Sequence, residues 1–231
     1  MDTTFPRLML EHAARRPLAT ALREKEYGIW QSLTWQTLAE MVKGLACGLH
    51  QAGLQRGEHV IVVGANRPRL YASMLAVQSL GAIPVPLYQD AVATEYVFPI
   101  NNADVRFAVV ENQEQVDKLL EIRPDCEQLA HIFFDDPRGL RNYQQVGLAS
   151  LSDLQDKGQQ FAKQTPTFFD KEVAINQADD VAAMFFTSGT TGNPKGVVHT
   201  HHSLIDRAQA GADFDHLGPN EEVLAYLPPA W

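Results

Sequence analysis

The sequence contains little cysteine and no long apolar run, and each shortage excludes a class of protein. Only Cys47 and Cys126 occur among the 231 residues, without CxxC spacing, so we expect no disulfide framework and a reducing compartment. No stretch approaches the ~18 apolar residues of a spanning helix, and the first residues lack a signal-peptide pattern. We therefore expect a cytoplasmic protein, and peripheral contact with the inner membrane face stays open.

Basic residues are also scarce. The chain has 19 Lys and Arg against 28 Asp and Glu, which gives a net charge of −9. Nucleic-acid binding needs basic surface that displaces counterions from phosphates, so no nucleic-acid partner is expected. A local basic pocket for a small anion remains compatible with this charge. The hydrophobic fraction of 45% is enough for an ordinary core, in one large domain or two small ones.

What the sequence does contain is an alternation of short apolar runs and amphipathic helices. The runs are "HVIVVGA", "AIPVPLY", "RFAVV" and "AHIFFDD", each followed by a helical pattern. This alternation predicts an α/β fold, with mostly parallel sheets flanked by helices. Prolines in "AIPVPLY" favour an edge strand. Before this region we expect two strands that turn at Tyr27-Gly28, then a helix capped by Thr34 and stopped at Gly53.

The rhythm changes after residue 163. Residues 164–180 are interpreted as a linker along the domain surface. A strand "VAAMFFTS", a glycine-rich loop, a strand "GVVHTH", a helix beginning near Ser203 and a last strand "EVLAYLP" are expected to follow. Because a strand that runs into "LPPAW" normally leads to another element, we expect these 231 residues to be part of a longer polypeptide.

The glycine-rich loop "TSGTTGNPKG", residues 187–196, is suited to phosphate. Its glycines allow backbone conformations in which amide N–H groups converge on an anion. The hydroxyls of Thr187, Ser188, Thr190 and Thr191 can donate to phosphate oxygens or bind a hard cation, and Lys195 adds a mobile positive charge. The alternative is a flexible hairpin of small residues. The loop is not a Walker A loop, because Lys195 precedes Gly196 and a strand follows.

The stretch "FFTSGTTGNPKGVVHTH" resembles the phosphate-loop motif of the adenylate-forming (AMP-binding) superfamily, which includes acyl-CoA synthetases, luciferases and peptide-synthetase adenylation domains. The stretches "GIWQSLTW", "PLYQDAVATEY" and "VRFAVVENQEQVDKLLEI" are more similar to its long-chain fatty acyl-CoA synthetase branch. The resemblance covers almost the whole chain. It implies that residues 1–231 are the amino-terminal portion of an adenylation domain, without the carboxy-terminal domain that carries a catalytic lysine.

The resemblance also implies a reaction. In this family a carboxylate attacks the α-phosphate of ATP, and the thiol of coenzyme A then displaces AMP to give a thioester. The small-molecule partners would be ATP, a fatty acid and coenzyme A, with Mg²⁺. Lys195 would be catalytic and would bind phosphate, and Thr187 would help to hold Mg²⁺. The β- and γ-phosphates would be wrapped by the residues of the loop that bind the nucleotide: Thr187, Ser188, Gly189, Thr190, Thr191, Gly192 and Lys195.

The chain departs from the family pattern in two ways. Trp231 stands where many members have histidine, at a position beside the acyl and adenylate site, so an indole would line the acid pocket or simply fill the core. The family's adenine-binding and ribose-binding motifs and its magnesium-binding glutamate do not occur in these residues. We therefore expect the 231 residues alone to form no acyl-adenylate. Two other interpretations stay open: an enzyme for an aryl, short-chain or amino acid, and a non-catalytic nucleotide-binding remnant.

Other polar groups are weaker signals. His199, His201 and His202 lack a carboxylate or cysteine at metal-site spacing, so a strand end that runs into a helix is favoured over a metal site. Glu111, Glu114 and Asp117 are interpreted as the solvated start of a helix.

Overall fold

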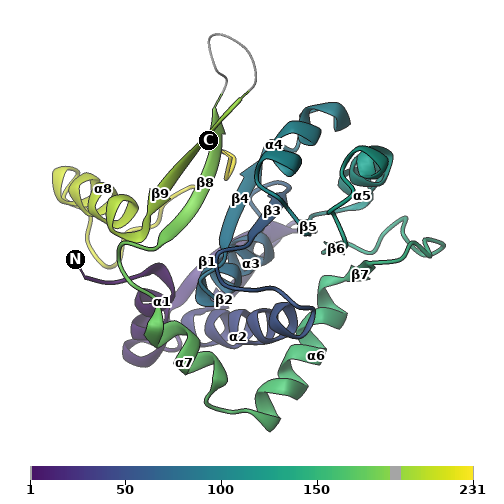
Figure 1. Cartoon of the computed structure of the whole chain (residues 1–231). Coiled ribbons are helices and arrows are strands. Elements are labelled where there is room, and N and C mark those ends of the chain that lie inside the picture. Colours follow the sequence, from purple (N-terminus) through teal and green to yellow (C-terminus); the bar gives the residue numbers. More distant parts are fainter. Residues whose placement is uncertain (1, 188–193, 231) are drawn as a thin grey trace.

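The computed structural model describes residues 2–187 and 194–230. A five-stranded parallel sheet forms its centre (Figure 1). In spatial order its strands are β4 (Ile83–Leu87), β3 (His59–Val63), β5 (Phe107–Val110), β6 (His131–Phe134) and β7 (Leu148–Ser150). The predicted α/β class and the edge position of the proline-containing strand β4 are confirmed. The three-residue strand β7 is too short to have given a sequence signal.

Helices cover both faces of this sheet. The described residues form the helices α1 (Phe5–Arg15), α2 (Trp35–Gln51), α3 (Pro68–Ser79), α4 (Val97–Asn102), α5 (Gln113–Ile122), α6 (Leu151–Gln164), α7 (Phe168–Ile175) and α8 (His201–Phe214), with 3₁₀ turns η1 (Ala93–Tyr96) and η2 (Arg123–Asp125). Helix α8 lies away from this sheet (Figure 1). Figure 1 shows α2 and α6 on one side and α4 and α5 on the other. Alternate residues of each strand face opposite sides, so Val60 and Val62 join one buried cluster whereas Ile61 and Val63 join the other.

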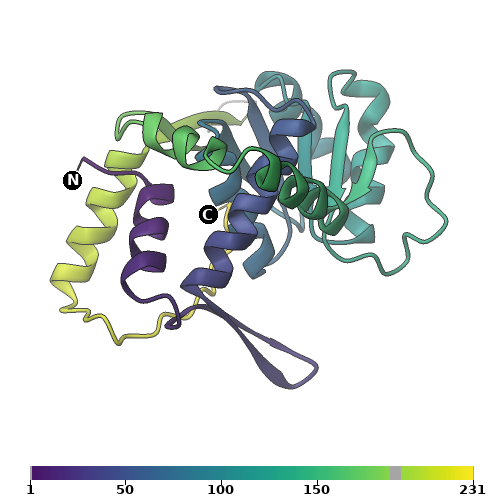
Figure 2. The same ribbon diagram turned by 90° about the horizontal axis from the view of Figure 1, so that it is seen from below.

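A β-hairpin precedes α2, as predicted. Strands β1 (Thr20–Glu26) and β2 (Ile29–Thr34) pair antiparallel and project from the rest of the molecule (Figure 2). Tyr27 and Gly28 have φ angles of 49° and 79°, the conformation that a two-residue hairpin turn requires. The Thr34 side chain accepts a hydrogen bond from the Thr37 backbone N–H and caps α2. The capping residue and the turn are therefore confirmed.

Residues 164–180 connect the parallel sheet to the second half of the chain, but they are more than a surface linker. They contain α7, whose Phe169 and Val173 are buried in the core cluster beneath α2. Asn176, directly after α7, is fully buried. The buried aromatic side chain explains the difference, because the "FF" pair in this segment provides the apolar face of a short helix.

The last part of the chain begins with a second hairpin. Strands β8 (Val181–Thr187) and β9 (Lys195–Thr200) pair antiparallel, and α8 begins at His201 rather than near Ser203 because Thr200 caps it. The expected last strand "EVLAYLP" is wrong: residues 221–226 have no regular secondary structure. A strand needs a partner, and in the described structure the backbone carbonyls of Ala225 and Leu227 bind the Asn66 side chain instead. None of the described helices is long and apolar enough to span a bilayer.

Helices α2 and α6 approach closely because both carry glycine at their contact. A Cβ atom added at Gly158 would lie 1.9 Å from the carbonyl oxygen of Gly44 and 2.4 Å from the amide nitrogen of Gly48. Both neighbours are backbone atoms, so no side-chain rotation can relieve the overlap. The interface therefore depends on the absence of a side chain at residue 158.

We predict that Gly158→Ala lowers the free energy of unfolding by about 1–3 kcal/mol, because the extra methyl group forces the two helices apart. Gly211→Ala is the matched control: a Cβ at this helical position meets nothing within 4 Å, and alanine should stabilise α8 by roughly 0.5–1 kcal/mol. Urea denaturation of both variants measures the difference. Equal stability of the two variants would contradict this description of the interface.

Candidate functional site

The β8–β9 hairpin brings Thr187 and Lys195 together at the end where β8 ends and β9 begins. The two residues are direct partners in the antiparallel register, so their side chains share one face, with Cβ atoms typically about 5 Å apart. Both residues are exposed. Ser188, Gly189, Thr190, Thr191 and Gly192, which the sequence assigns to the phosphate site, lie outside the described residues, as does Trp231. The described part of the site is therefore the pair of residues that flanks this segment.

The opposite face of the hairpin packs on the parallel sheet, since β8 runs beside β4. Met184 and Phe186 join the buried cluster on the α4–α5 side, and the ring of Phe186 meets that of Phe98 edge-on at 6.3 Å. Gly196 lies directly opposite Phe186, and a Cβ there would lie 3.1 Å from the Met184 sulfur. Met184 and Phe186 of β8 therefore pack on the inward face of the hairpin, although Val198 of β9 on the same face is 53% exposed, and Thr187 and Lys195 lie on the outward face.

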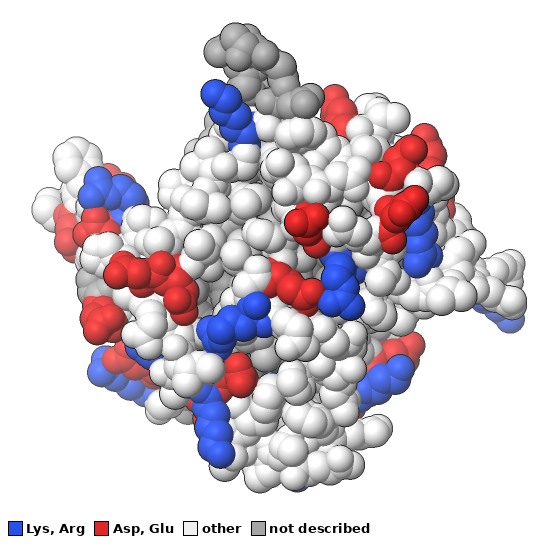
Figure 3. Space-filling view, in the orientation of Figure 1, with Lys and Arg blue, Asp and Glu red and all other residues white. Residues whose placement is uncertain are grey.

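Within the described ranges 2–187 and 194–230, no carboxylate forms an ion pair with Lys195. Most of the ion pairs that these ranges do contain involve arginine, such as the pair of Arg69 with Asp135 at 2.6 Å. Figure 3 shows acidic and basic side chains interspersed over this face of the molecule rather than gathered into one patch. Among the described residues, the exposed ammonium group of Lys195 therefore has no carboxylate as an ion-pair partner.

Two buried amide side chains anchor the base of the hairpin. Gln78, at the end of α3, donates to the Ala182 carbonyl of β8 at 2.8 Å. Asn176 donates to the carbonyls of Gln78 and Ser79 at 2.9 and 3.3 Å, and its oxygen accepts from Arg56 at 2.7 Å. These contacts fix β8 to α3. The end of the hairpin that carries Thr187 and Lys195 is therefore held at a defined place relative to the parallel sheet.

His199 and His201, near the end of β9, lie in different environments. No group of metal-ligating side chains is present in the part of the chain that the structure describes. His199 stacks edge-on against Phe185, with ring centroids 5.8 Å apart. His201 is buried, and its Nδ1 accepts a hydrogen bond from the Phe5 backbone N–H at 3.3 Å. Burial lowers the pKa of His201 to about 4, so the ring is neutral near pH 7 and joins α8 to α1.

A charged cluster at the carboxyl ends of β3, β5 and β6 was missed by sequence reasoning. Glu111, predicted to be solvated, is buried; it accepts from the Ala65 N–H at 2.7 Å and from Arg67 Nε at 2.9 Å. Arg67 also binds Glu24 at 3.2 Å. A carboxylate that directly follows the apolar run "RFAVV" was the available signal. The cluster borders a cavity of about 410 Å³ lined by Glu24, Glu26, Tyr27, Arg67, Arg69, Glu111, Asp135, Asp136, Pro137 and Arg138.

The charges in this cavity compensate one another. The hydrogen bonds that Arg67 donates to Glu111 and Glu24 raise the pKa of Arg67, and the hydrogen bonds that Arg138 donates to Asp136 lower the pKa of Asp136. Asp135 differs, because its burial raises its pKa despite the neighbouring Arg69. The cavity is therefore lined largely by a network of ion pairs, which join Arg67 to Glu24 and Glu111, Arg69 to Asp135, and Arg138 to Asp136.

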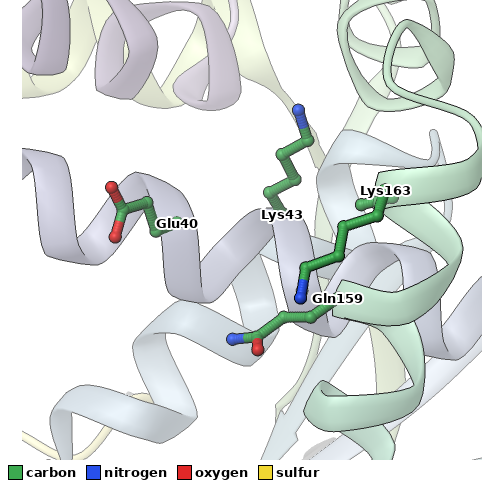
Figure 4. A pocket seen from close by; sticks show the side chains of 6 residues that line it. Glu40, Lys43, Gln159 and Lys163 are labelled. Atoms are coloured by element: carbon green, nitrogen blue, oxygen red, sulfur yellow. The ribbon is translucent and has the colours of Figure 1, made fainter.

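A second cavity, of about 330 Å³, lies between α2 and α6. Figure 4 shows Glu40 and Lys43 on α2 and Gln159 and Lys163 on α6 around it. Lys43 is engaged with the core, because its Nζ lies 3.5 Å from the Pro166 carbonyl and 6.0 Å from the centre of the Phe169 ring. The cavity contains no residue of the β8–β9 hairpin and contributes nothing to that site.

Comparison with known proteins identifies what this arrangement is similar to. The model of the AMP-binding enzyme family matches residues 9–231. The long-chain-fatty-acid–CoA ligase ACSBG2 of Mus musculus is 28% identical over 229 residues, which are 97% of this chain and 34% of the relative. The chain thus spans about a third of the length of the curated relatives that it matches.

Solved structures show the same fold. Acetoacetyl-CoA synthetase from Streptomyces lividans aligns with 100% of this chain and 35% of its own, with a TM-score of 0.81 and 19% identity. The anthranilate CoA ligase AuaEII, solved with anthranoyl-AMP, aligns with 90% of this chain and 36% of its own, with a TM-score of 0.75 and 22% identity. At these identities the comparison establishes the architecture only.

The buried, neutral His201 makes a pH-dependent stability prediction. Its pKa in the folded protein is about 4, below its ordinary value of about 6.5, so the unfolded chain binds a proton that the folded chain does not. We therefore expect stability to fall as the pH decreases from about 6.5 to about 4. His201→Asn, whose amide oxygen can accept the Phe5 N–H bond without titrating, should lose less stability over this interval.

Urea midpoints measured between pH 4 and 7 test this. His216→Asn serves as the control, because His216 is exposed and its loss should leave the pH dependence unchanged. A pH dependence of His201→Asn equal to that of the wild type would show that the buried imidazole does not contribute.

Proposed function

Because the chain belongs to the family of AMP-binding enzymes, we propose that it is the amino-terminal portion of an adenylation domain that activates a carboxylic acid with ATP. The acid is a long-chain fatty acid, and the product is its coenzyme A thioester. The observation that carries the proposal is the pairing of Thr187 with Lys195 at the two ends of a segment rich in glycine and hydroxyl groups.

The chemistry requires an anion site of this kind. A carboxylate oxygen attacks the α-phosphorus of ATP, and the bond to the bridging oxygen of pyrophosphate breaks, which gives acyl-adenylate and pyrophosphate. The thiol of coenzyme A then attacks the acyl carbonyl and AMP leaves with the electron pair. Negative charge develops on pyrophosphate in the first step. A preorganised ammonium group and N–H donors stabilise such charge, and Lys195 is free of an ion-pair partner among the described residues.

The roles of single residues follow from this chemistry. Lys195 is proposed to neutralise the β- and γ-phosphates, and Ser188, Gly189, Thr190, Thr191 and Gly192 are proposed to bind them. Thr187 is a fitting ligand for Mg²⁺, because a hydroxyl oxygen suits a hard cation and the residue is exposed at the strand end. When bound, the ion would neutralise phosphate charge.

The choice of a fatty acid rests on the relatives. The Mus musculus relative is a long-chain-fatty-acid–CoA ligase, whereas the similar structures include synthetases or ligases for acetoacetate and anthranilate. Trp231 is proposed to border the acid. Because a substrate of this type is poorly soluble in water, we propose that the enzyme is cytoplasmic and makes peripheral contact with the inner membrane face. The alternative acids, aryl, short-chain or amino, use the same phosphate site.

We predict that Lys195→Met, in the protein as encoded by its gene, lowers the rate of acid-dependent ATP–pyrophosphate exchange by about 10²–10³-fold. Methionine keeps the length of the side chain and removes the charge that stabilises the departing pyrophosphate. Lys157→Met, on the exposed face of α6, is the matched control and should exchange at the wild-type rate.

Exchange by Lys195→Met at the rate of the control would contradict the proposed role of Lys195. A panel of acids in the wild-type assay identifies the substrate: exchange that depends on long-chain fatty acids supports the proposed acid, and exchange with aryl or amino acids alone replaces it. A wild-type protein that binds ATP without any exchange would be the non-catalytic remnant.

A further inference from the structure

Residues 219–227 have no regular secondary structure, yet side chains of the amino-terminal half hold their backbone. Val223, Leu224 and Tyr226 are 79%, 78% and 75% exposed, so apolar burial does not fix this segment. Asn66 instead donates from its side-chain Nδ2 to the Ala225 carbonyl at 2.7 Å and to the Leu227 carbonyl at 2.9 Å. One amide group thus binds the carbonyls of two residues that are two positions apart, which fixes the position of this part of the backbone relative to Asn66.

The orientation of the Asn66 amide is set by Tyr71 on α3. The Tyr71 hydroxyl donates to Asn66 Oδ1 at 2.8 Å, so the oxygen of the amide faces α3 and the nitrogen faces residues 225–227. Burial raises the pKa of Tyr71, which keeps its hydroxyl protonated as a donor. Every polar atom of the Asn66 side chain therefore has a partner, and an aspartate at this position could not donate to either carbonyl.

The loop that carries Asn66 is itself rigid. Glu111, at the end of β5, binds the residues on both sides of Asn66: the Ala65 N–H at 2.7 Å and Arg67 Nε at 2.9 Å. Gly64 permits this approach, because a Cβ there would lie 2.6 Å from the Glu111 Cβ and 2.5 Å from a methyl carbon of Leu70. The buried carboxylate thus fixes the backbone from which Asn66 reaches residues 219–227.

We infer that Asn66 is a positioning residue that holds residues 225–227 at the carboxyl end of the parallel sheet and thereby shapes the acid-binding side of the site, whereas Arg16 and Arg23 contact Pro219 and Glu222 earlier in the segment. This inference rests on the proposed function. The loop 64–67 follows β3 at the carboxyl edge of the sheet, where open α/β sheets bind their ligands. Residues 219–227 lead to Trp231, which is proposed to border the acid.

The phosphate side of the site has a separate support. The β8–β9 hairpin is anchored through Gln78 and Asn176, neither of which contacts Asn66 or residues 219–227. Loss of the Asn66 contacts should therefore affect the acid and leave ATP binding unchanged. A residue that merely supports the whole fold would impair both substrates together.

The test is Asn66→Asp, which preserves shape but removes both donors and places a charge against two carbonyl oxygens. In the protein as encoded by its gene, with the long-chain fatty acid as varied substrate, we expect the KM for the acid to rise about 5–30-fold in pyrophosphate exchange. The KM for magnesium–ATP should stay within a factor of about two. Asn101→Asp is the matched control, because Asn101 also donates to a carbonyl, that of Asp125 at 2.9 Å, away from this segment.

Limited chymotrypsin digestion tests the contact between Asn66 and residues 225–227 independently of catalysis. Cleavage after Leu224 and Tyr226, well below the unfolding temperature, should be about 5–30-fold faster in Asn66→Asp than in the wild type or Asn101→Asp. If Asn66→Asp does not fold, Tyr71→Phe, which removes only the bond that orients the amide, takes its place in both assays and should show smaller changes in the same direction.

Wild-type cleavage and an unchanged KM for the acid would overturn the inference, as would an equal rise of both KM values. Absence of exchange in the wild type contradicts the proposed function and with it the kinetic part of the inference. Faster cleavage of Asn66→Asp would still support the contact in that case, and unchanged cleavage would overturn it.

Discussion

The position of the candidate site depends on the buried hydrogen bonds that join α3 to β8. Gln78 and Asn176 are 5% and 0% exposed, and each donates to a main-chain carbonyl across this junction. A buried polar group without its partner costs about 1–3 kcal/mol, so the two amides strongly favour one placement of β8. The hairpin extends from this fixed base. Thr187 and Lys195, at the end where β8 ends and β9 begins, therefore have a defined position.

Two groups of contacts, rather than one, surround the carboxyl edge of the sheet. The hairpin is fixed through α3 and the residues that follow α7, whereas residues 225–227 are fixed through Asn66 in the loop after β3, which the buried Glu111 supports. Each group consists of side-chain bonds to main-chain carbonyls or amides, which hold backbone segments without requiring regular secondary structure. In the proposed enzyme this separation would allow the phosphate side and the acid side to be adjusted independently.

The sequence predicted those features whose cause is local. The turn at Tyr27-Gly28, the Thr34 cap, and the alternation of apolar strands and helices each depend on residues a few positions apart. The loop at 187–196 was found because its glycines, hydroxyls and lysine are contiguous. The buried role of Glu111 and the irregular course of residues 221–226 were not predicted, because they depend on Ala65, Arg67 and Asn66, which are 44 to more than 150 residues away in the chain.

The proposed function requires that Lys195 contact the terminal phosphates of a nucleotide bound at the hairpin. The most direct measurement is NMR of the protein with ¹³C-methylated lysines, in which the Lys195 signal is assigned by its loss in Lys195→Arg. We expect a saturable shift of this signal with magnesium–ATP and with magnesium–pyrophosphate, and none with AMP. An unchanged Lys195 signal under conditions in which calorimetry shows bound ATP, or an equal shift with AMP, would contradict it.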